Sequence, residues 1–487
     1  MKTAFGSHPR ACAHLPQRAF FSYNIHVSFP DSIFRMYDIR GKVPDEVNED
    51  FAHRLGLAFG AYLRGKGLAG SVAVGRDTRL HSPSIQGALM EGLRKAGYNA
   101  IDLGMVPTPL VYFAQFQLDV VGAIQVSASH NPPEFNGFKI GVGHDTIYGD
   151  EIQVLKEIMK AEAWAGPGGG REEWFDIVTP YLDWIKRNIL IERPLRLAVD
   201  PGNGTTGPIV EKLYPLFPIE FKGINMAPDG NFPAHLPDPT VVKYTQQLRD
   251  FMLKEGLPMG IGFDGDGDRL GVLDENGDLI FADKILAVFA EDIIANQPGA
   301  QIVMDVKCSA GVMEFINSIG GQAILSKTGH SLIKARLKEL GAAMAGEMSG
   351  HMFFADRFFG YDDAVYASMR LCEIISRTGK SVSELIAPIP VYYSTPEIRA
   401  EVSPEERKFA IVDELVAHFK SKGYNVIDID GVRLQFPDGF ALARASNTQA
   451  VIVLRFEGKT PERLEEIKDI MYKKLREYPE VTISEEE

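Results

Sequence analysis

Apolar runs that end at an aspartate and continue into helix-like sequence recur along the chain. Three such runs are Ser71 to Arg76, Leu195 to Val199, and Gln301 to Met304. Strands that alternate with helices form βαβ units and therefore parallel or mixed sheets. The repetition predicts three related mixed-sheet α/β domains.

The C-terminal part of the chain has a different pattern. Ser403, Pro404 and Glu406 have the spacing of an N-cap, an N1 proline and a capping-box acid, which predicts a helix starting there. A second helix is expected from Thr460 and Pro461. Between the two helices lie β-like segments at Asn425 to Asp430, Val432 to Phe436, Phe440 to Ala443 and Ala450 to Phe456. A small α+β domain is therefore expected at the end of the chain.

The first thirty residues contain Lys2, Arg10 and Arg18 but no acid before Asp31. A transit peptide, a disordered tail and a translation start placed too early are all open interpretations of this extension. The sequence GPGGG at 166–170 indicates a flexible break near the first boundary. We expect an extension over residues 1–30 and four domains over residues 31–175, 176–278, 279–391 and 392–487.

Composition excludes several classes of protein. The 487 residues, at about 150 per domain, allow three or four domains. The formal net charge of −14 disfavours attraction to nucleic acid or anionic lipid, so an anionic substrate would need a local basic pocket. No apolar run reaches the length of about 18 residues that a membrane span needs. Cys12, Cys308 and Cys372 are too far apart for a thiolate zinc site and odd in number, which favours a reducing cytoplasm.

The strongest chemical signal is the sequence DGDGDR, which places Asp264, Asp266 and Asp268 at alternate positions between apolar strands. Carboxylate oxygens select Mg²⁺ or Ca²⁺ over softer metals. A calcium EF-hand would need glycine at the sixth loop position, which is Arg269, and helices on both sides. The remaining interpretations are a magnesium site in a strand-loop-strand hairpin and a solvated acidic turn.

Three further segments carry candidate chemistry. Ser129 lies in SASHNPP after the apolar run Val120 to Val126, where a hydroxyl could act as a nucleophile; the alternative is a turn in which Asn131 caps its own backbone. RASNT at 444–448 could hold a phosphate, or could be a hairpin turn with a solvated Arg444. GEMSGH at 346–351 and KTGH at 327–330 have donors and acceptors suited to sugar hydroxyls, although single histidines are usually structural.

The chain from about Phe34 to Phe456 resembles the α-D-phosphohexomutase superfamily, and within it the bacterial and archaeal phosphomannomutase/phosphoglucomutase branch. The matching motifs occur in order as FRMYDIRG from residue 34, GRD at 75–77, SASHNPPEFNGFK, DPGNG at 200–204, DGDGDR, DVK at 305–307, TGH at 328–330, GEMSGH and RASNT. The resemblance implies three related α/β domains and a fourth small domain around a central cleft, in agreement with the pattern of elements.

The resemblance also implies residue roles. Ser129 would be phosphorylated and, with Asp264, Asp266 and Asp268, would hold Mg²⁺. The other catalytic positions would be Arg40, His130, Lys139, Arg269 and His351, with Lys139 and His351 the candidates for the general acid and base and Arg40 an electrostatic alternative. The substrate-binding positions would be Tyr37, Lys307, Thr328, Gly329, His330, Glu347, Ser349, Arg444, Ser446, Asn447 and Thr448.

The activity implied is interconversion of hexose 1-phosphates and 6-phosphates, of mannose or glucose or both. It would proceed through the phosphoserine and a 1,6-bisphosphate, with glucose or mannose 1,6-bisphosphate as primer. Alternatives are a phosphoglucosamine mutase and a non-catalytic sugar-phosphate or calcium-binding protein. Ser127, His81 and the pair Gln449-Ala450 depart from the common pattern, and Ser127 is an alternative phosphate acceptor. We expect hexose phosphates as partners, neither nucleic acid nor membrane, and a monomer or weak homo-oligomer.

Overall fold

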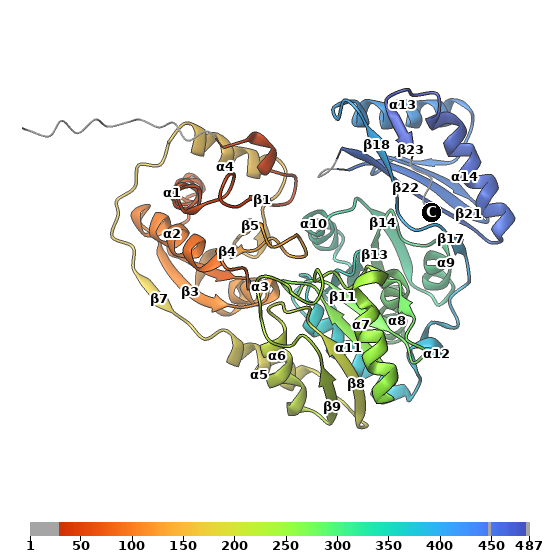
Figure 1. The fold of residues 1–487 in the computed structure, drawn as a ribbon, viewed down its shortest axis with the longest axis horizontal. Coiled ribbons are helices and arrows are strands. Elements are labelled where there is room, and N and C mark those ends of the chain that lie inside the picture. Colours follow the sequence, from red (N-terminus) through yellow and green to blue (C-terminus); the bar gives the residue numbers. More distant parts are fainter. Residues whose placement is uncertain (1–28, 447–449, 484–487) are drawn as a thin grey trace, which may run out of the picture.

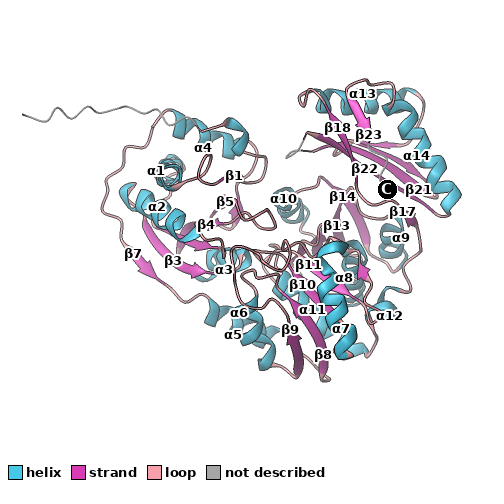
Figure 2. Ribbon diagram, in the orientation of Figure 1, coloured by secondary structure: helices cyan, strands magenta, loops and turns pink. Residues whose placement is uncertain are grey.

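The computed structural model describes residues 29–446 and 450–483. The expectations for the extension up to residue 28 and for Asn447 and Thr448 lie outside these residues. Figure 1 shows four units arranged in chain order, with domain IV in blue next to domain III and across from domain I in red to yellow. Figure 2 shows that helices cover the sheets on the outside, while loops gather at the centre of the molecule.

Domain I contains a sheet of order β1-β5-β4-β2-β3-β7, with β6 paired to β5. β2, β3, β4 and β7 run parallel to one another, and β5 is antiparallel to both β4 and β1. Its strands are β1 Ile39–Lys42, β2 Ser71–Arg76, β3 Asn99–Met105, β4 Val120–Val126, β5 Phe135–Val142, β6 Asp145–Thr146 and β7 Glu172–Trp174. Its helices are α1 Glu49–Gly65, α2 Ser82–Lys95, α3 Thr108–Gln117 and α4 Asp150–Lys160.

Domains II and III contain sheets of order β12-β11-β10-β8-β9 and β14-β13-β15-β16. The strands are β8 Leu195–Asp200, β9 Ile219–Gly223, β10 Gly260–Phe263, β11 Leu270–Leu273, β12 Leu279–Ile280, β13 Gln301–Asp305, β14 Gln322–Ser326, β15 Met344–Gly346 and β16 Met352–Phe354. The helices are α5 Val178–Asn188, α6 Gly207–Leu213, α7 Val242–Glu255, α8 Ala282–Asn296, α9 Ala310–Ser318, α10 His330–Leu340, α11 Ala364–Thr378 and α12 Val382–Ile386.

The first three domains share one strand topology, which confirms that they are related mixed-sheet units. The orders β3-β2-β4-β5, β9-β8-β10-β11 and β14-β13-β15-β16 are equivalent, with three parallel strands followed by one antiparallel strand. The three runs predicted from the sequence are β2, β8 and β13, the second strand in each order. Each begins a βαβ unit because a helix follows it directly.

Domain IV contains an antiparallel sheet of order β19-β20-β21-β22-β18-β23, with β17 paired to β22. The elements are β17 Tyr393–Ser394, β18 Ile398–Val402, α13 Arg407–Ser421, β19 Val426–Ile427, β20 Val432–Phe436, β21 Gly439–Ala445, β22 Val451–Gly458, α14 Pro461–Leu475 and β23 Val481–Ile483. The α+β class is confirmed, and α14 begins as predicted, with the Thr460 side chain accepting a hydrogen bond from the Arg463 amide.

The predicted start of the other helix is wrong. α13 begins at Arg407 rather than after Ser403, and no side chain caps it. The Ser403 amide instead donates to the Glu480 carbonyl at 3.0 Å, which continues the sheet edge of β18 beyond Val402. Residues 403–406 therefore form a turn, since the sheet uses the amide of the expected capping residue.

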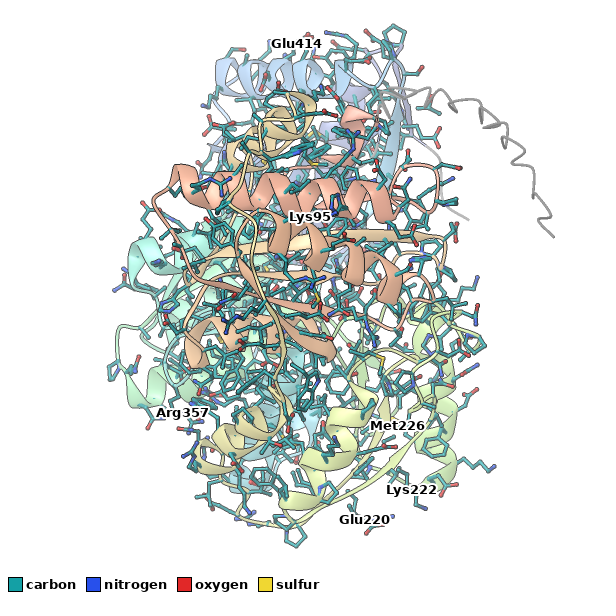
Figure 3. All side chains as sticks on the ribbon, turned by 90° about the vertical axis from the view of Figure 1, so that its left-hand side faces the viewer. Lys95, Glu220, Lys222, Met226, Arg357 and Glu414 are labelled. Carbon is teal, nitrogen blue, oxygen red and sulfur yellow. The ribbon has the colours of Figure 1, made fainter. Side chains whose placement is uncertain are left out.

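Hydrophobic packing joins the first three domains more closely than the fourth. One cluster of buried side chains runs from Leu110 in α3 through Phe263 in β10 to Phe289 in α8, whereas domain IV has its own core around Phe456. Figure 3 shows Glu414 of α13 at one end of the molecule and Glu220 of β9 at the other. Within the described residues, no helix is long and apolar enough to cross a membrane.

Candidate active site

The main candidate residues lie on loops at the same topological position in each α/β domain. Each loop leaves the last parallel strand and returns as the antiparallel one, and the three loops are 127–134 between β4 and β5, 264–269 between β10 and β11, and 347–351 between β15 and β16. Ligands of open α/β sheets bind beyond the carboxyl ends of parallel strands. The shared topology thus brings these loops to one region, where Figure 2 shows the loops gathered. We call 127–134 the serine loop, 264–269 the aspartate loop and 347–351, which has donors and acceptors suited to sugar hydroxyls, the sugar-type loop.

The serine loop contacts the aspartate loop directly. The Ser129 hydroxyl donates to Asp264 Oδ2 at 2.6 Å, and Thr108 at the start of α3 donates to Asp266 Oδ2 at 2.5 Å. A Cβ at Gly265 would lie only 2.6 Å from the Ser129 carbonyl oxygen. Glycine at this position therefore allows the two loops to touch.

The three aspartates form a buried cluster rather than a solvated turn, which excludes that alternative. Asp264, Asp266 and Asp268 are each 0% exposed, and oxygens from all three lie within 4.8 Å of one another. Asp266 Oδ1 and Asp268 Oδ1 are buried with no hydrogen-bond partner among the described residues. Hard oxygen donors with unused capacity fit Mg²⁺.

Lys139 of β5 supplies positive charge to this cluster. Its Nζ lies 2.8 Å from Asp266 Oδ2 and also bonds to Asp268 Oδ2. Burial alone would lower the pKa of Lys139, but Asp266 and Asp268 raise it well above its usual value. Burial, reinforced by the two neighbouring carboxylates, raises the pKa of Asp264 well above its usual value.

Ser129 has an unusual backbone conformation. Its φ is +51°, in the left-handed region that residues other than glycine seldom adopt. The Ser129 amide donates to Ser127 Oγ at 2.8 Å, and its own Oγ lies 3.0 Å from His130 Nδ1. Ser127, the alternative acceptor, thus supports the loop backbone, while Ser129 points its hydroxyl at the carboxylates. Asn131 accepts from Arg40 at 2.8 Å rather than capping its own backbone.

Arg269 and His351 join the aspartate loop to the loop of domain III. Arg269 Nε donates to His351 Nε2 at 3.1 Å, and the Leu270 amide donates to the Gly350 carbonyl at 3.0 Å. On its other side, His351 Nδ1 lies 3.1 Å from Asp362 Oδ2. Burial and the neighbouring Arg269 hold the pKa of His130 well below its usual value.

The sugar-type loop is organised around Glu347. Its Oε1 accepts from the Gly329 amide at 2.6 Å, and burial raises the pKa of Glu347. Gly329 has a φ of +129°, and a Cβ there would lie 2.4 Å from the Tyr37 ring. The Tyr37 hydroxyl donates to the Thr328 carbonyl at 2.8 Å, which brings domain I to this loop. Ser349 is half-buried in the same loop.

His330, the first residue of α10, is buried beside these residues. Burial, together with the charge of Lys334, lowers the pKa of His330 well below its usual value. The ring centroids of His330 and His351 are stacked 5.6 Å apart.

Arg444 of domain IV is buried and paired rather than solvated. Its Nε donates to Asp430 Oδ2 at 2.9 Å, and the same oxygen accepts from the Thr328 amide of domain III at 3.0 Å. Lys307 donates to Glu397 Oε2 at 2.7 Å. Ser446 is buried at the end of β21. Arg444 and Lys307 thus bring positive charge from domains IV and III to the same side of the site.

Several residues of the site were missed from the sequence. They are Thr108, Asp238, Asp362 and Asp430, each of which contacts a predicted residue from a distant segment. Asp238 lies 3.8 Å from Arg269 Nη1; burial would raise its pKa, but His130 and Arg269 lower it. Thr108, Asp238 and Asp430 lie in no motif, so no local signal could have found them. Asp362 lies in the stretch FGYDDAVYA at 359–367, which favours the mannose and glucose branch but assigns Asp362 no role.

The fold and site define a class: a four-domain α/β protein with a serine loop in contact with a buried carboxylate cluster, and a buried arginine in the fourth domain. Family models match every domain. They are the phosphoglucomutase/phosphomannomutase alpha/beta/alpha domain I at residues 31–165, domain II at 179–277, domain III at 281–392, and the C-terminal domain at 397–474. The chain belongs to the phosphoglucomutase/phosphomannomutase family.

Individual relatives agree with this assignment. The phosphomannomutase/phosphoglucomutase of Pseudomonas aeruginosa is 41% identical over 92% of this chain and 96% of its own length. The phosphoglucomutase of Neisseria gonorrhoeae is 40% identical over 91% of this chain and 96% of its own. A crystal structure of a phosphoglucomutase/phosphomannomutase family protein from Burkholderia thailandensis superposes with a TM-score of 0.87 at 41% identity, covering 92% of this chain and 98% of that one.

Proposed function

We propose that this protein interconverts the 1-phosphates and 6-phosphates of mannose, glucose or both, through a phosphoserine at position 129 and a hexose 1,6-bisphosphate. The observation that carries the proposal is the Ser129 hydroxyl, 2.6 Å from Asp264 in a buried three-carboxylate cluster that also binds Lys139. A protein that only binds sugar phosphates needs no hydroxyl presented at such a cluster.

Asp264, Asp266 and Asp268 would hold Mg²⁺ together with the phosphate on Ser129. When bound, this ion supplies neutralising charge to the phosphoryl group that is transferred. Glucose or mannose 1,6-bisphosphate is the proposed primer that first phosphorylates Ser129.

In the forward reaction, a hexose 1-phosphate places its free O6 hydroxyl against the phosphoserine. The bond from phosphorus to Ser129 Oγ breaks as the bond from phosphorus to O6 forms; the O6 proton passes to a base, and Ser129 Oγ takes up a proton from an acid. After the bisphosphate reorients, its other phosphoryl group passes from O1 to Ser129 Oγ; the serine gives its proton to a base, and O1 takes up a proton from an acid. Lys139 and His351 are the candidates for these proton transfers.

Other side chains bind and orient the sugar. Arg444 is proposed to offer its terminal guanidinium nitrogens to the phosphate that does not react, while its Nε donates to Asp430. Glu347 and Ser349 are proposed to bind sugar hydroxyls, and Arg40, His130 and Arg269 to neutralise charge around the serine. Tyr37, Lys307, Thr328, Gly329 and His330 would complete the substrate contacts from domains I and III.

The test is ³¹P NMR of the purified protein with Mg²⁺, a trace of glucose 1,6-bisphosphate and, in separate tubes, mannose 1-phosphate, glucose 1-phosphate or glucosamine 1-phosphate. We expect 6-phosphates from mannose and glucose. Product from glucosamine phosphate alone would make the protein a phosphoglucosamine mutase, and no product in any tube would favour a binding protein.

A matched variant tests the nucleophile. Ser129→Ala should abolish turnover and incorporation of phosphate while leaving the affinity for hexose phosphate, measured by calorimetry, within about threefold, because the phosphate-binding residues are in domain IV. Full activity of Ser129→Ala would disprove the assignment and make Ser127 the residue to test next.

We also propose a cytoplasmic location. Cys308 and Cys372 are buried and unpaired, as is usual in a reducing compartment. Fractionation of cells that express the full chain would test this.

A further inference from the structure

Arg79 has a fully buried guanidinium for which the proposed reaction has no role so far. It lies just after β2, and its side chain is 0% exposed. Charged side chains are almost never fully buried unless their charge and donors are satisfied. The contacts that satisfy Arg79 therefore show what it supports.

Among the residues that the structure describes, the Arg79 guanidinium donates to the serine loop and to one carboxylate. Nη2 donates to the carbonyl oxygens of Ser129 at 2.8 Å and Asn131 at 2.6 Å, and Nη1 donates to that of Pro132 at 2.5 Å. Three carbonyl dipoles of one short loop thus point at a single cation. Without it, these oxygens would repel one another in a region shielded from water.

Asp77 fixes the guanidinium in place. Asp77 Oδ2 accepts from Arg79 Nε at 3.0 Å and lies 3.3 Å from the Ala128 amide, inside the serine loop. Its Oδ1 accepts from the Arg79 amide at 3.0 Å and from Ser82 at 2.5 Å. The carboxylate therefore holds both the arginine and the start of the loop that the arginine binds.

The same turn occurs in all three α/β domains, but only domain I uses it in this way. In each domain an aspartate at or just after the end of a strand accepts a hydrogen bond from the backbone amide two residues later. The pairs are Asp77 with Arg79 at 3.0 Å, Asp200 with Gly202 at 2.8 Å, and Asp305 with Lys307 at 3.0 Å. The second residue is a glycine in domain II and a lysine directed toward domain IV in domain III. Arginine at this position is thus specific to the domain that carries the serine.

A loop of domain II closes over the arginine. The Arg79 guanidinium carbon lies 5.1 Å from the centre of the Phe232 ring, and a Cβ at Gly230 would lie 2.6 Å from the Arg79 Cα. This loop belongs to the domain that supplies the aspartates. Arg79 therefore sits at the junction of the two domains whose loops bring Ser129 to Asp264.

We propose that Arg79 is a positioning residue that holds Ser129 in its left-handed conformation and so directs its hydroxyl at the carboxylate cluster. The inference rests on the proposed role of Ser129 as phosphate acceptor. The φ of +51° at Ser129 costs free energy that the surrounding contacts must offset, and the bond from Arg79 to the Ser129 carbonyl is one of them. Arg79 touches no substrate atom in this role.

The test compares Arg79→Lys with the wild type in a single turnover with glucose 1,6-bisphosphate and Mg²⁺, following the gain of phosphate by intact mass. Lysine keeps the charge beside Asp77, so the fold should be retained, but one ammonium cannot replace two nitrogens spread over three carbonyls. We expect the phosphorylation rate and kcat to fall about 100-fold, the loss associated with a misplacement of about 1 Å. Affinity of the dephosphorylated enzyme for glucose 1-phosphate should change less than about threefold, because Arg444 is unaffected.

Two further proteins complete the test. The double variant with Arg79→Met and Asp77→Asn removes both charges together, so that neither is left unpaired, and should lose at least as much rate as Arg79→Lys. Arg64→Met is the matched control, because Arg64 also donates to two carbonyls in domain I, those of Ala96 and Ala165, far from the serine loop. It should phosphorylate at the wild-type rate.

The outcomes separate the two proposals. If a folded Arg79 variant gains phosphate at the wild-type rate, or loses hexose phosphate affinity as strongly as rate, the positioning role is wrong. If the wild type gains no phosphate, or Ser129→Ala gains as much as the wild type, the proposed function itself is wrong, and the role of Arg79 falls with it.

Discussion

At the scale of single residues, the site contains a buried cluster of opposite charges formed by Lys139, Asp266 and Asp268. Each charge in it is compensated by the others. Removing one partner of a buried ion pair costs about 3 to 5 kcal/mol because the remaining charge is left uncompensated. The two carboxylates would then attract any cation that can reach them. This dependence gives a test of the metal site that does not rely on turnover.

We predict that Lys139→Met loses about 3 kcal/mol of stability without Mg²⁺, and that Mg²⁺ restores more stability to the variant than it adds to the wild type. A cation that binds only the folded chain stabilises it, and the variant has the greater uncompensated negative charge. Urea unfolding with and without Mg²⁺ measures both values. Lys95→Met, which removes an exposed lysine paired with Glu91, is the control and should respond like the wild type; an equal Mg²⁺ response in all three proteins would contradict the prediction.

A second prediction concerns His235 in domain II. Its Nε2 lies 2.9 Å from Asp200 Oδ2; burial would lower the pKa of His235, but the bond to Asp200 raises it above its usual value. Because the pKa of His235 is higher in the folded than in the unfolded chain, its contact with Asp200 stabilises the fold fully below about pH 6.5, the usual pKa of histidine. This stabilisation is lost as the pH rises through the pKa of His235 in the folded protein. Stability of the wild type relative to His235→Gln should therefore be greater at pH 5.5 than at pH 8.5. Urea midpoints at both values measure it, and a difference independent of pH would show that the ring acts by packing alone.

Contiguous motifs made the aspartates, Ser129 and Arg444 predictable from the sequence, because their chemistry is concentrated in a few adjacent positions. Thr108, Asp238 and Asp430 were not predictable, since each acts through a contact with a segment 14 to 158 residues away. The roles of Arg79 and Asp77 depend on the path of a loop 50 residues further on. The local sequence therefore indicates the chemistry of a residue, whereas its long-range contacts are known only from the fold.

At the scale of the elements, the serine loop and the aspartate loop can touch only because their backbones approach closely at Gly265. We predict that Gly265→Ala lowers kcat at least tenfold with little change in global unfolding, because the added Cβ would lie 2.6 Å from the Ser129 carbonyl and must push the two loops apart. Steady-state kinetics and thermal unfolding measure the two effects. Gly87→Ala in α2, where the space around the new Cβ is open, is the control and should keep full activity. Normal kcat in Gly265→Ala would mean that the contact is unimportant.

Element boundaries were predicted well where one local signal decides them and poorly where the sheet competes. Thr460 caps α14 as its sequence predicts. Ser403 has an equally good capping pattern, but its amide pairs with the Glu480 carbonyl at the sheet edge. β20 has the predicted bounds, whereas the predicted strand at Asn425 to Asp430 shrinks to Val426–Ile427. Long-range pairing overrode the local capping signal at Ser403, whereas β19 pairs only with the next strand, β20.

At the scale of the whole molecule, domain IV is attached to domain III through a small apolar cluster, Val306 and Ala310 with Phe440 and Leu442, and through buried polar contacts. Arg433 of β20 is 0% exposed and donates to the carbonyls of Val306 and Cys308 in domain III. The pair of Lys307 and Glu397 and the bond from Thr328 to Asp430 lie close by. The position of Arg444 relative to Ser129 therefore depends on this interface.

We predict that Arg433→Met raises the KM for hexose phosphate about tenfold or more while kcat falls less. Each hydrogen bond to a charged group contributes about 1.5 to 3 kcal/mol. Without two of them domain IV is held less firmly against domain III, and with it Arg444, the proposed phosphate-binding residue. Kinetics and the radius of gyration from small-angle scattering measure the effect. Arg463→Met, which removes a contact with Asp438 inside domain IV, is the control. An unchanged KM and an unchanged radius would show that other contacts suffice to place the domain.

The aspartate turn shared by the three α/β domains has a consequence for how such a protein could have arisen and could be redesigned. One ancestral unit, copied twice within a gene, would supply three copies of the same turn and the same strand connection. Each copy could then diverge in a few loop positions without altering its sheet. The loop of each domain could thus have changed independently of the other two. If Glu347 and Ser349 bind the sugar as proposed, changing these two positions while keeping His351, which bonds to Arg269, is a route to a new sugar preference.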